Sequence, residues 1–276
     1  MVQSAKPAKP PKPGTLAAKA DRHECYENAV QCVESEIDFV TENYERIRGR
    51  KAVTLREDFC GTANTSCEWV RRRKANRALS VDLDQEVLEW GRKNNLGKLS
   101  ADQQSRIELL KEDVRAVDRK ADIVLAMNFS YQIFKTRDGL REYFKSVRDT
   151  LNDDGVLFID AFGGYESYRA VKEKTKYKGF TYVWDQHEYD PMTGHMLCYI
   201  HFGFKDGSRL KRAFSYEWRM YTLPEIQEIL GEAGYKNVTV YWEGTDEESG
   251  EGNGEYLPAT EGDDDPAWIV YVSAEK

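Results

Sequence analysis

Leu55-Arg56-Glu57-Asp58-Phe59-Cys60-Gly61-Thr62-Ala63 forms a short turn between an expected strand and an expected helix. An apolar run with β-branched residues precedes this turn, and residues 64–74 after it have a helical pattern. A strand, a tight turn and a helix in this order direct backbone N–H groups and a helix N-terminus at one point. The stretch therefore favours binding of a nucleotide-like ligand.

A second signal follows about twenty residues later. Ala78-Leu79-Ser80-Val81-Asp82-Leu83-Asp84 reads as another strand, and this strand ends in an acid. An acid at this position accepts hydrogen bonds from both hydroxyls of a ribose. The two signals together predict an adenosine-containing cofactor on an α/β sheet.

Composition limits the class of protein. The 276 residues suffice for one large domain or for a domain with an insertion. No run reaches the roughly 18 apolar residues of a membrane span, so no membrane partner is expected. The net charge of −8 disfavours nucleic acid as a partner. The basic run at 71–74 is interpreted as a solvated helix end.

Cysteine usage indicates the compartment. The five cysteines form no CxxC pair and no cluster with histidine, so we expect reduced thiols, no metal site and a cytoplasmic protein. Near the N-terminus there is no apolar region of the kind that a signal peptide carries. Residues 1–20 are rich in lysine and proline and contain no acid, which predicts a disordered tail.

The order of expected elements predicts a mostly parallel sheet covered on both faces. Helical patterns fill residues 21–48, and strands then alternate with helices as far as residue 163. The rhythm then changes, and between about 180 and 221 there are three strand-like runs separated by two hairpin turn signals. A helix and two further strands follow from 222, and the acidic, glycine-rich stretch 243–265 between those strands is interpreted as a long mobile loop.

A parallel sheet finished by an antiparallel hairpin resembles that of the class I S-adenosylmethionine (SAM) methyltransferases. The resemblance covers about 50–163 and 222–275. It implies a Rossmann-like α/β fold with a seven-stranded sheet, mostly parallel with an antiparallel last strand. Residues 21–163 and 222–276 would form the SAM-binding domain, and 164–221 an inserted antiparallel meander that caps the substrate site or forms a homodimer.

The resemblance also implies which residues hold the cofactor. Glu57 occupies the position of the acid that orients the methionine ammonium, Asp82 that of the ribose acid, and Leu83 that of the residue against adenine. The segment after the third strand matches the adenine-binding segment, and the segment after the fourth strand matches one near the sulfonium. The expected cofactor-binding residues are Arg56, Glu57, Phe59, Gly61, Thr62, Asp82, Leu83, Asp113, Val114, Asn128 and Phe129.

The turn departs from the family pattern GxGxG because only Gly61 is retained. Phe59 and Ala63 stand where glycines are expected, and phenylalanine does not readily adopt positive φ, so we expect a locally different turn. Arg56 and Asp58 lie two apart on one face of the strand. They form either a structural ion pair or a site in which Arg56 holds a carboxylate, such as that of the cofactor methionine.

The expected acceptor is a small molecule, with nitrogen slightly favoured as the methylated atom, because the insertion resembles that of methyltransferases acting on small amines. Tyr131, Trp184, Tyr216 and Arg219 are the candidate substrate-binding residues. An amine acceptor needs a group that takes a proton. The candidate catalytic residues are Tyr26, on the helix expected to fold over the cofactor, His187 and Asp160.

Three other interpretations stay open at this point. One is a methyltransferase directed at RNA or protein, which salt-sensitive RNA binding at 71–74 would support. Another is a non-catalytic SAM-binding protein, which the altered turn favours. The last is a nucleotide-sugar or nicotinamide oxidoreductase, against which the terminal hairpin argues.

Overall fold

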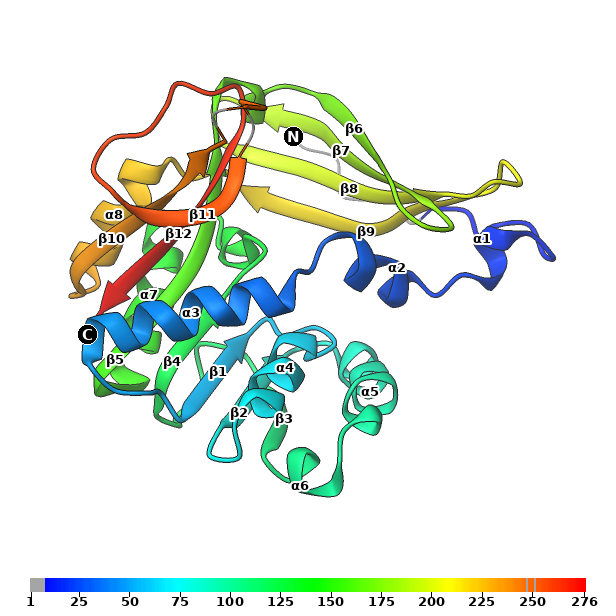
Figure 1. The fold of residues 1–276 in the computed structure, drawn as a ribbon. Coiled ribbons are helices and arrows are strands. Elements are labelled where there is room, and N and C mark those ends of the chain that lie inside the picture. The colour runs from blue at the N-terminus through cyan, green and yellow to red at the C-terminus, as the bar shows by residue number, and fades with distance from the viewer. Residues whose placement is uncertain (1–7, 247, 251) are drawn as a thin grey trace.

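Two β-sheets make up the framework of the chain, whose residues 8–246, 248–250 and 252–276 are described by a computed structural model (Figure 1). The larger sheet has eight strands in the order β11-β10-β12-β5-β4-β1-β2-β3, and the smaller has the order β6-β7-β8-β9. The strands of the larger sheet are β1 Thr54–Asp58, β2 Arg77–Asp82, β3 Ile107–Lys111, β4 Ala121–Ala126, β5 Leu151–Gly163, β10 Lys236–Thr245, β11 Gly252–Ala259 and β12 Trp268–Glu275.

The five neighbouring strands β5, β4, β1, β2 and β3 pair in parallel. In contrast, β12 lies antiparallel to β5, and β10 lies antiparallel to β12. All six residues of β4 are buried, as expected for a central strand covered on both faces. The mostly parallel sheet with an antiparallel last strand is therefore confirmed.

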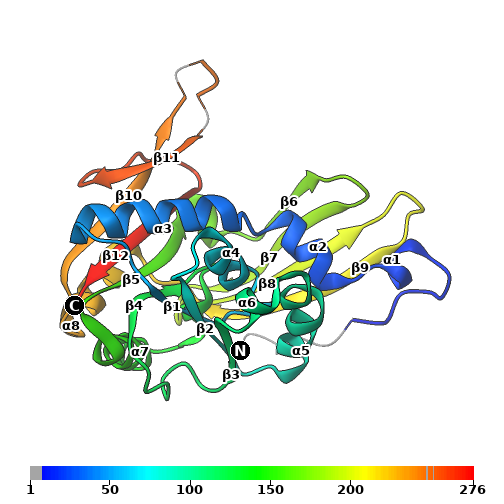
Figure 2. The same ribbon diagram turned by 60° about the horizontal axis from the view of Figure 1, so that its bottom comes forward.

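Helices cover both faces of this sheet. The helices of the described residues are α1 Leu16–Lys19, α2 Arg22–Ala29, α3 Val33–Arg48, α4 Asn64–Arg72, α5 Gln85–Asn94, α6 Ala101–Gln104, α7 Arg137–Thr150 and α8 Leu223–Glu232, with short 3₁₀ turns at Leu96–Lys98, Ser130–Ile133 and Tyr165–Tyr168. Of these, α1 and α2 pack against the smaller sheet. One apolar cluster joins α3, α4 and α5 to the sheet, and a second joins α7 and α8 to its other face. Figure 2 shows α3 and α7 with β4 and β5 between them.

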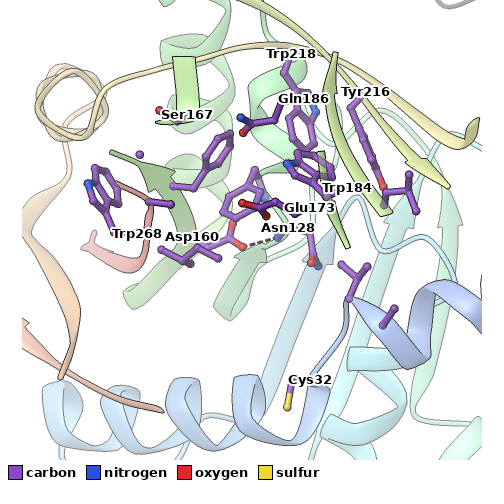
Figure 3. A pocket seen from close by; sticks show the side chains of 18 of the residues that line it. Cys32, Asn128, Asp160, Ser167, Glu173, Trp184, Gln186, Tyr216, Trp218 and Trp268 are labelled. Carbon is purple, nitrogen blue, oxygen red and sulfur yellow. Dashed lines mark hydrogen bonds between the residues drawn. The ribbon is translucent and has the colours of Figure 1, made fainter. Parts of the chain in front are cut away.

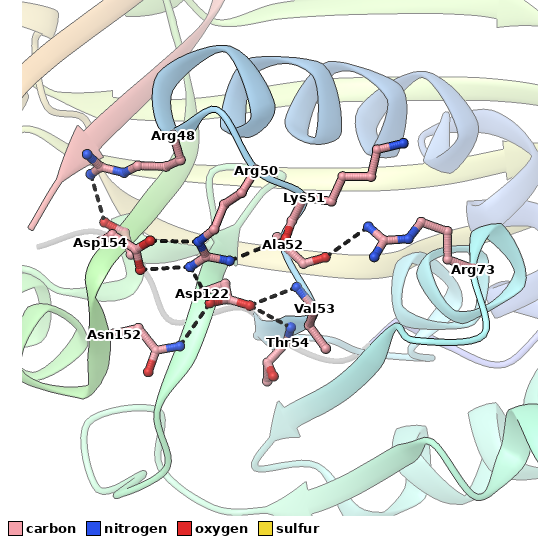
Figure 4. A network of polar contacts seen from close by, with 11 residues as sticks. Arg48, Arg50, Lys51, Ala52, Val53, Thr54, Arg73, Asp122, Asn152 and Asp154 are labelled. Atoms are coloured by element: carbon pink, nitrogen blue, oxygen red, sulfur yellow. Dashed lines mark hydrogen bonds and ion pairs between the residues drawn. The ribbon is translucent and has the colours of Figure 1, made fainter.

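The amino ends of the parallel strands are held by one polar network (Figure 4). Asp122, at the start of β4, accepts the backbone N–H groups of Val53 and Thr54 at 2.7 and 3.0 Å. Arg50 bridges Asp122 to Asp154, with nitrogen–oxygen distances of 2.9 and 2.7 Å. The network fixes β1 against β4 and β5 at the edge opposite the carboxyl ends of the strands.

The smaller sheet is an antiparallel meander of β6 Val171–Lys176, β7 Thr181–Asp190, β8 His195–Gly203 and β9 Arg209–Arg219. These strands fall within the predicted insertion 164–221. Figure 1 shows the meander extending over the large sheet, and its side chains meet residues at the carboxyl ends of β1 and β4 in two cavities.

Two strands were missing from the sequence prediction. β6 adds a fourth strand to the meander, although only Val171 of its six residues is apolar and most of them are exposed. β11 lies within 243–265 and pairs with β10, which makes the large sheet eight-stranded rather than seven-stranded. The interpretation of 243–265 as a loop throughout is therefore wrong, because strand pairing at a sheet edge does not require apolar side chains.

The tail prediction is also wrong for part of residues 1–20. Thr15 caps the helix α1, whose Ala17 is buried. The backbone N–H of Leu16 donates to Asp206 at 2.9 Å, which attaches α1 to the turn between β8 and β9. Residues 1–7 of the predicted tail lie outside the described residues.

Candidate active site

Two cavities lie between the carboxyl ends of the parallel strands and the meander. The turn cavity, of about 720 Å³, is lined by the 57–62 turn, Asp82, residues 8–11 and part of β9. The aromatic cavity, of about 600 Å³, is lined by the ends of β4 and β5, by α3 and by the inner face of the meander. Both volumes are typical of sites for small molecules or cofactors.

The turn keeps the backbone conformation that its sequence argues against. Phe59, Gly61 and Ala63 have φ values of 57°, 53° and 55°. The prediction that Phe59 would force a different local turn is therefore wrong. Phe59 is stabilised by ring contacts with Phe134 and Tyr143 at centroid distances of 6.3 and 5.7 Å.

Left-handed non-glycine residues concentrate at the two cavities. Among the described residues six have positive φ without being glycine, and four of these line a cavity. Each such residue costs of order 1–3 kcal/mol and persists where the surrounding structure imposes it. The four are Phe59, Asn128, Phe129 and Arg212.

Asp82 lies where the sequence predicted an acid. One carboxylate oxygen accepts the Gly61 backbone N–H at 2.8 Å, and the other accepts that of Asp84 at 2.9 Å. These bonds use two of about four lone-pair positions, which leaves acceptors for a diol. Burial raises the pKa of Asp82.

Three residues that the sequence analysis missed support the turn. The Asn95 amide donates to the Thr62 carbonyl at 3.1 Å and to Glu27 at 2.6 Å, and the Thr62 hydroxyl donates to Glu27 at 2.5 Å. Gly91 allows α5 to approach closely, since a Cβ there would collide with the Thr62 backbone. Gly91 was the detectable signal, because glycine inside a helical pattern indicates a close approach.

We expect Gly91→Ala to weaken S-adenosylhomocysteine binding about tenfold or more, because the turn must shift to admit the methyl group. Gly97→Ala is the matched control, since a Cβ there meets only ordinary contact at 3.6 Å. Calorimetric titration of both variants checks this prediction. Equal affinities would show that the turn tolerates the displacement.

The structure decides for the ion-pair interpretation of Arg56. Its side chain is fully buried, and its guanidinium donates to both carboxylate oxygens of Asp58 at 2.6 and 2.9 Å. The remaining donors reach the Thr150 hydroxyl and the Val114 carbonyl. Arg56 lines neither cavity, so its assignment as a cofactor-binding residue is wrong.

Glu57 lines the turn cavity and also caps α4. Its carboxylate accepts the backbone N–H of Ser66 at 2.9 Å and the Ser66 hydroxyl. Burial raises its pKa to about 7. Its proposed contact with a methionine ammonium stays a prediction.

The expected adenine-binding residues are not among those that line the turn cavity. Leu83 is 63% exposed, and Asp113 forms a bidentate pair with Arg115. Val114 is buried, and its carbonyl accepts a hydrogen bond from Arg56. The side chain of Val114 therefore belongs to the core, whereas the roles of Leu83 and Asp113 stay predictions.

Asp160 lies within the aromatic cavity, as Figure 3 shows. Its carboxylate accepts the backbone N–H groups of Asn128 and Phe129, both at 2.8 Å, and so fixes the left-handed turn after β4. Burial raises its pKa to about 7. A carboxylate with this pKa exchanges protons readily near neutral pH.

The two cavities meet at three residues that line both. These are Tyr26 from α2, Asn128 from the turn after β4 and Tyr216 from β9. The Tyr26 and Tyr216 hydroxyls interact by a hydrogen bond, and burial raises the pKa of both phenols. A group transferred between the two cavities would pass these residues.

The candidate residues of the meander differ in whether they face a cavity. Trp184 and Tyr216 line the aromatic cavity as predicted, but His187 does not. Side chains alternate along β7, so Trp184 and Gln186 face the cavity whereas Asp185 and His187 face away from it. The assignment of His187 as a catalytic residue is therefore wrong.

Two substrate-binding assignments are wrong for related reasons. Tyr131 is fully buried, and its hydroxyl donates to the Asp160 carbonyl at 2.8 Å. Arg219 pairs with Glu225 at 3.0 Å and lies over the Tyr221 ring, outside both cavities. Both residues stabilise the framework around the aromatic cavity.

Three buried carboxyl groups make stability depend on pH. Burial raises the pKa of Glu36, Glu57 and Asp160 to about 7, above the values of 4.5, 4.5 and 3.8 in the unfolded chain. The folded state therefore binds more protons, and its free energy of unfolding falls as pH rises from about 4.5 through 7. Each group contributes on the order of 3 kcal/mol to this fall.

We accordingly expect the melting temperature to be higher at pH 5.5 than at pH 8, and Glu36→Gln to reduce that difference. Thermal unfolding followed by circular dichroism across this range measures the effect. A melting temperature that rises steadily from pH 5.5 to 8 would contradict the prediction.

Comparisons with known proteins agree with this geometry. No protein-family profile matches the chain. A curated protein named "Putative methyltransferase YqeM", from Bacillus subtilis (strain 168), is 25% identical over 199 residues, which are 68% of this chain and 76% of that protein.

Solved structures share the fold over most of the chain. CalS10, an amino pentose methyltransferase from Micromonospora echinaspora solved with SAM bound, superposes with a TM-score of 0.64 at 16% identity, covering 92% of this chain and 96% of that one. The chain has the class I SAM-dependent methyltransferase fold. The sugar N-methyltransferase KedS8 from Streptoalloteichus has a TM-score of 0.60 at 15% identity, with 92% of each chain covered.

These findings confirm the predicted fold, and they agree with the methyltransferase class and the SAM cofactor expected from the sequence. The residues at the turn cavity fit that cofactor, because Asp82 retains free acceptors beside the turn and the volume suits a nucleoside ligand.

No helix among the described residues is long and apolar enough to cross a membrane.

Proposed function

We propose that the chain methylates a nitrogen atom of a small-molecule amine. SAM would bind in the turn cavity and the acceptor in the aromatic cavity. The observation that carries this proposal is the junction of the two cavities at Tyr26, Asn128 and Tyr216. Transfer requires the acceptor atom and the methyl group to lie about 3–3.5 Å apart in line, and a junction between two adjoining sites meets this need.

The negative charge of the aromatic cavity supports nitrogen as the methylated atom of the acceptor. Its lining contains carboxylates but no lysine, arginine or histidine among the described residues. Such a lining attracts an amine, which is a cation at neutral pH. The structural similarity to CalS10 and KedS8, named for an amino pentose and for sugar N-methylation, supports the same acceptor class.

The chain's own residues then have distinct roles. When bound, SAM supplies a methyl group activated by its positive sulfur. Asp82 would hold the ribose, and Asp160 would take the proton that an ammonium acceptor must lose before its nitrogen can react. Tyr26 and Tyr216 would orient the nitrogen at the junction.

Matched pairs of acceptors test the proposal. The protein is incubated with SAM and either benzylamine or benzyl alcohol, and either glucosamine or glucose. S-adenosylhomocysteine and methylated product are measured by mass spectrometry. We expect product only from amines, at a rate that rises with pH through about 7. Product from the alcohols alone would overturn the choice of nitrogen, and cofactor binding without turnover of any acceptor would favour a non-catalytic role.

Two further assignments remain predictions of the proposal. A cytoplasmic location agrees with the five free cysteines. Homodimer formation through the meander is tested by light scattering of the purified chain, where a monomeric mass at micromolar concentration would contradict it.

A further inference from the structure

The lining of the aromatic cavity is strongly acidic. Five carboxylates line it, and no basic side chain among the described lining residues balances them. Low-dielectric walls strengthen the attraction of such a site for a cation. The five are Glu36, Asp160, Glu166, Glu173 and Glu243.

Four of these carboxylates have other partners or face solvent. Asp160 accepts two backbone N–H groups, and Glu166 pairs with Arg169 at 3.3 Å. Glu243 accepts a backbone N–H and a tyrosine hydroxyl. Glu173 is exposed at the rim. None of the four has a buried oxygen that awaits a ligand.

Glu36 differs from the others. It lies in the first turn of α3 and is only 8% exposed, and its Oε2 has no hydrogen-bond partner within the described part of the chain. A buried acceptor without a partner costs about 1–3 kcal/mol. Burial raises the pKa of Glu36, an effect that Cys32 and Thr65 partly offset by hydrogen bonding.

We propose that Glu36, whose side chain lines the aromatic cavity, binds the acceptor by turning its carboxylate toward a cationic nitrogen of the incoming amine. This inference rests on the proposed function. It assigns to Glu36 the preference of the site for charged acceptors over neutral ones. Aromatic rings of the same cavity, with Trp184, Tyr216 and Trp218 at centroid separations of 4.6–6.2 Å, would face the rest of the molecule. The ring faces also attract a cation.

Calorimetric titration of the protein saturated with S-adenosylhomocysteine tests the inference without requiring turnover. The probes are benzylammonium chloride and its neutral analogue benzyl alcohol. The wild type is expected to prefer benzylammonium, and Glu36→Gln to weaken that binding about tenfold or more. Glu42→Gln, which removes the same charge from an exposed position of α3 outside both cavities, is expected to change the affinity less than threefold, about the effect of an exposed ion pair.

Several outcomes would overturn the inference. The first is an unchanged benzylammonium affinity in Glu36→Gln, and the second is a wild type with no preference for the cation. The third is a loss of S-adenosylhomocysteine affinity in Glu36→Gln that equals its loss of benzylammonium affinity, which would place Glu36 at the donor site instead. A wild type that binds no S-adenosylhomocysteine would refute the proposed function separately. Should Glu36→Gln not fold, Glu36→Asp, which retracts the charge by one methylene, must weaken benzylammonium binding in the same assay.

Discussion

Arg56→Met is expected to lower the free energy of unfolding by about 3–5 kcal/mol, because it leaves the Asp58 carboxylate buried without its partner. For a chain of this size the loss corresponds to a fall in melting temperature of roughly 6–20 °C. The hydroxyl of Tyr143, which donates to Asp58 at 2.8 Å, cannot replace a cation. Denaturant unfolding and thermal unfolding both measure the change.

The chain provides a matched control in Arg115→Met. Arg115 forms a bidentate pair with Asp113, also two residues away, but the two side chains are 47% and 35% exposed rather than fully buried. We expect this variant to lose at most about 1 kcal/mol. The double variant Arg56→Met, Asp58→Met should be more stable than Arg56→Met alone. Equal losses in the two single variants would contradict the role given to burial.

Asp82→Asn is expected to weaken S-adenosylhomocysteine binding about 100-fold. The substitution removes the charged acceptor for the ribose hydroxyls, and hydrogen bonds to charged groups are worth about 1.5–3 kcal/mol. It also replaces one of the two oxygens that hold the backbone N–H groups of Gly61 and Asp84. Calorimetric titration measures the affinity, and transfer at subsaturating SAM should fall in proportion.

Asp84→Asn controls for charge at the same end of the sheet. Asp84 caps α5 by accepting the backbone N–H groups of Glu86 and Val87, and asparagine caps helices equally well. Its cofactor affinity should therefore remain within about twofold of the wild type. If both variants bind S-adenosylhomocysteine as the wild type does, the turn cavity is not the donor site.

The parallel sheet and the position of Asp82 at its carboxyl edge could be predicted because their signals are local. Buried strands such as Ala121–Ala126 are nearly continuous apolar runs. An acid at the end of a parallel strand lies at the carboxyl edge of the sheet, and this position does not depend on the conformation of the loops. β11 has no such signal, because its residues are polar and glycine-rich and its partner β10 supplies the hydrogen bonds. Pairing of this kind depends on tertiary contact.

The side chains of the meander were harder to assign, because they depend on register. Alternation along β7 places Trp184 on the cavity face and His187 with Asp185 on the other face, and which face meets the cavity depends on how the meander packs. His187 was misplaced for this reason. Glu36 was overlooked because it lies next to Ile37 in α3, whose apolar stripe includes Ile37 and Val40. From the sequence alone, an acid at such a position is expected to be exposed to solvent.

Because side chains alternate along β7, the residues that would contact the acceptor and those that would contact the methyl donor lie in different stretches of the chain. Tyr182, Trp184 and Gln186 project into the aromatic cavity from a strand whose other residues carry the framework, whereas the donor side depends on 57–62 and Asp82. Substituting Tyr182 or Trp184, neither of which lines the turn cavity, would change which acceptors enter while leaving the donor pocket intact. A library at these two positions would therefore sample new acceptors, whereas Gln186 is kept because its amide donates to the backbone carbonyls of Glu166 and Arg169 at 3.1 and 3.0 Å.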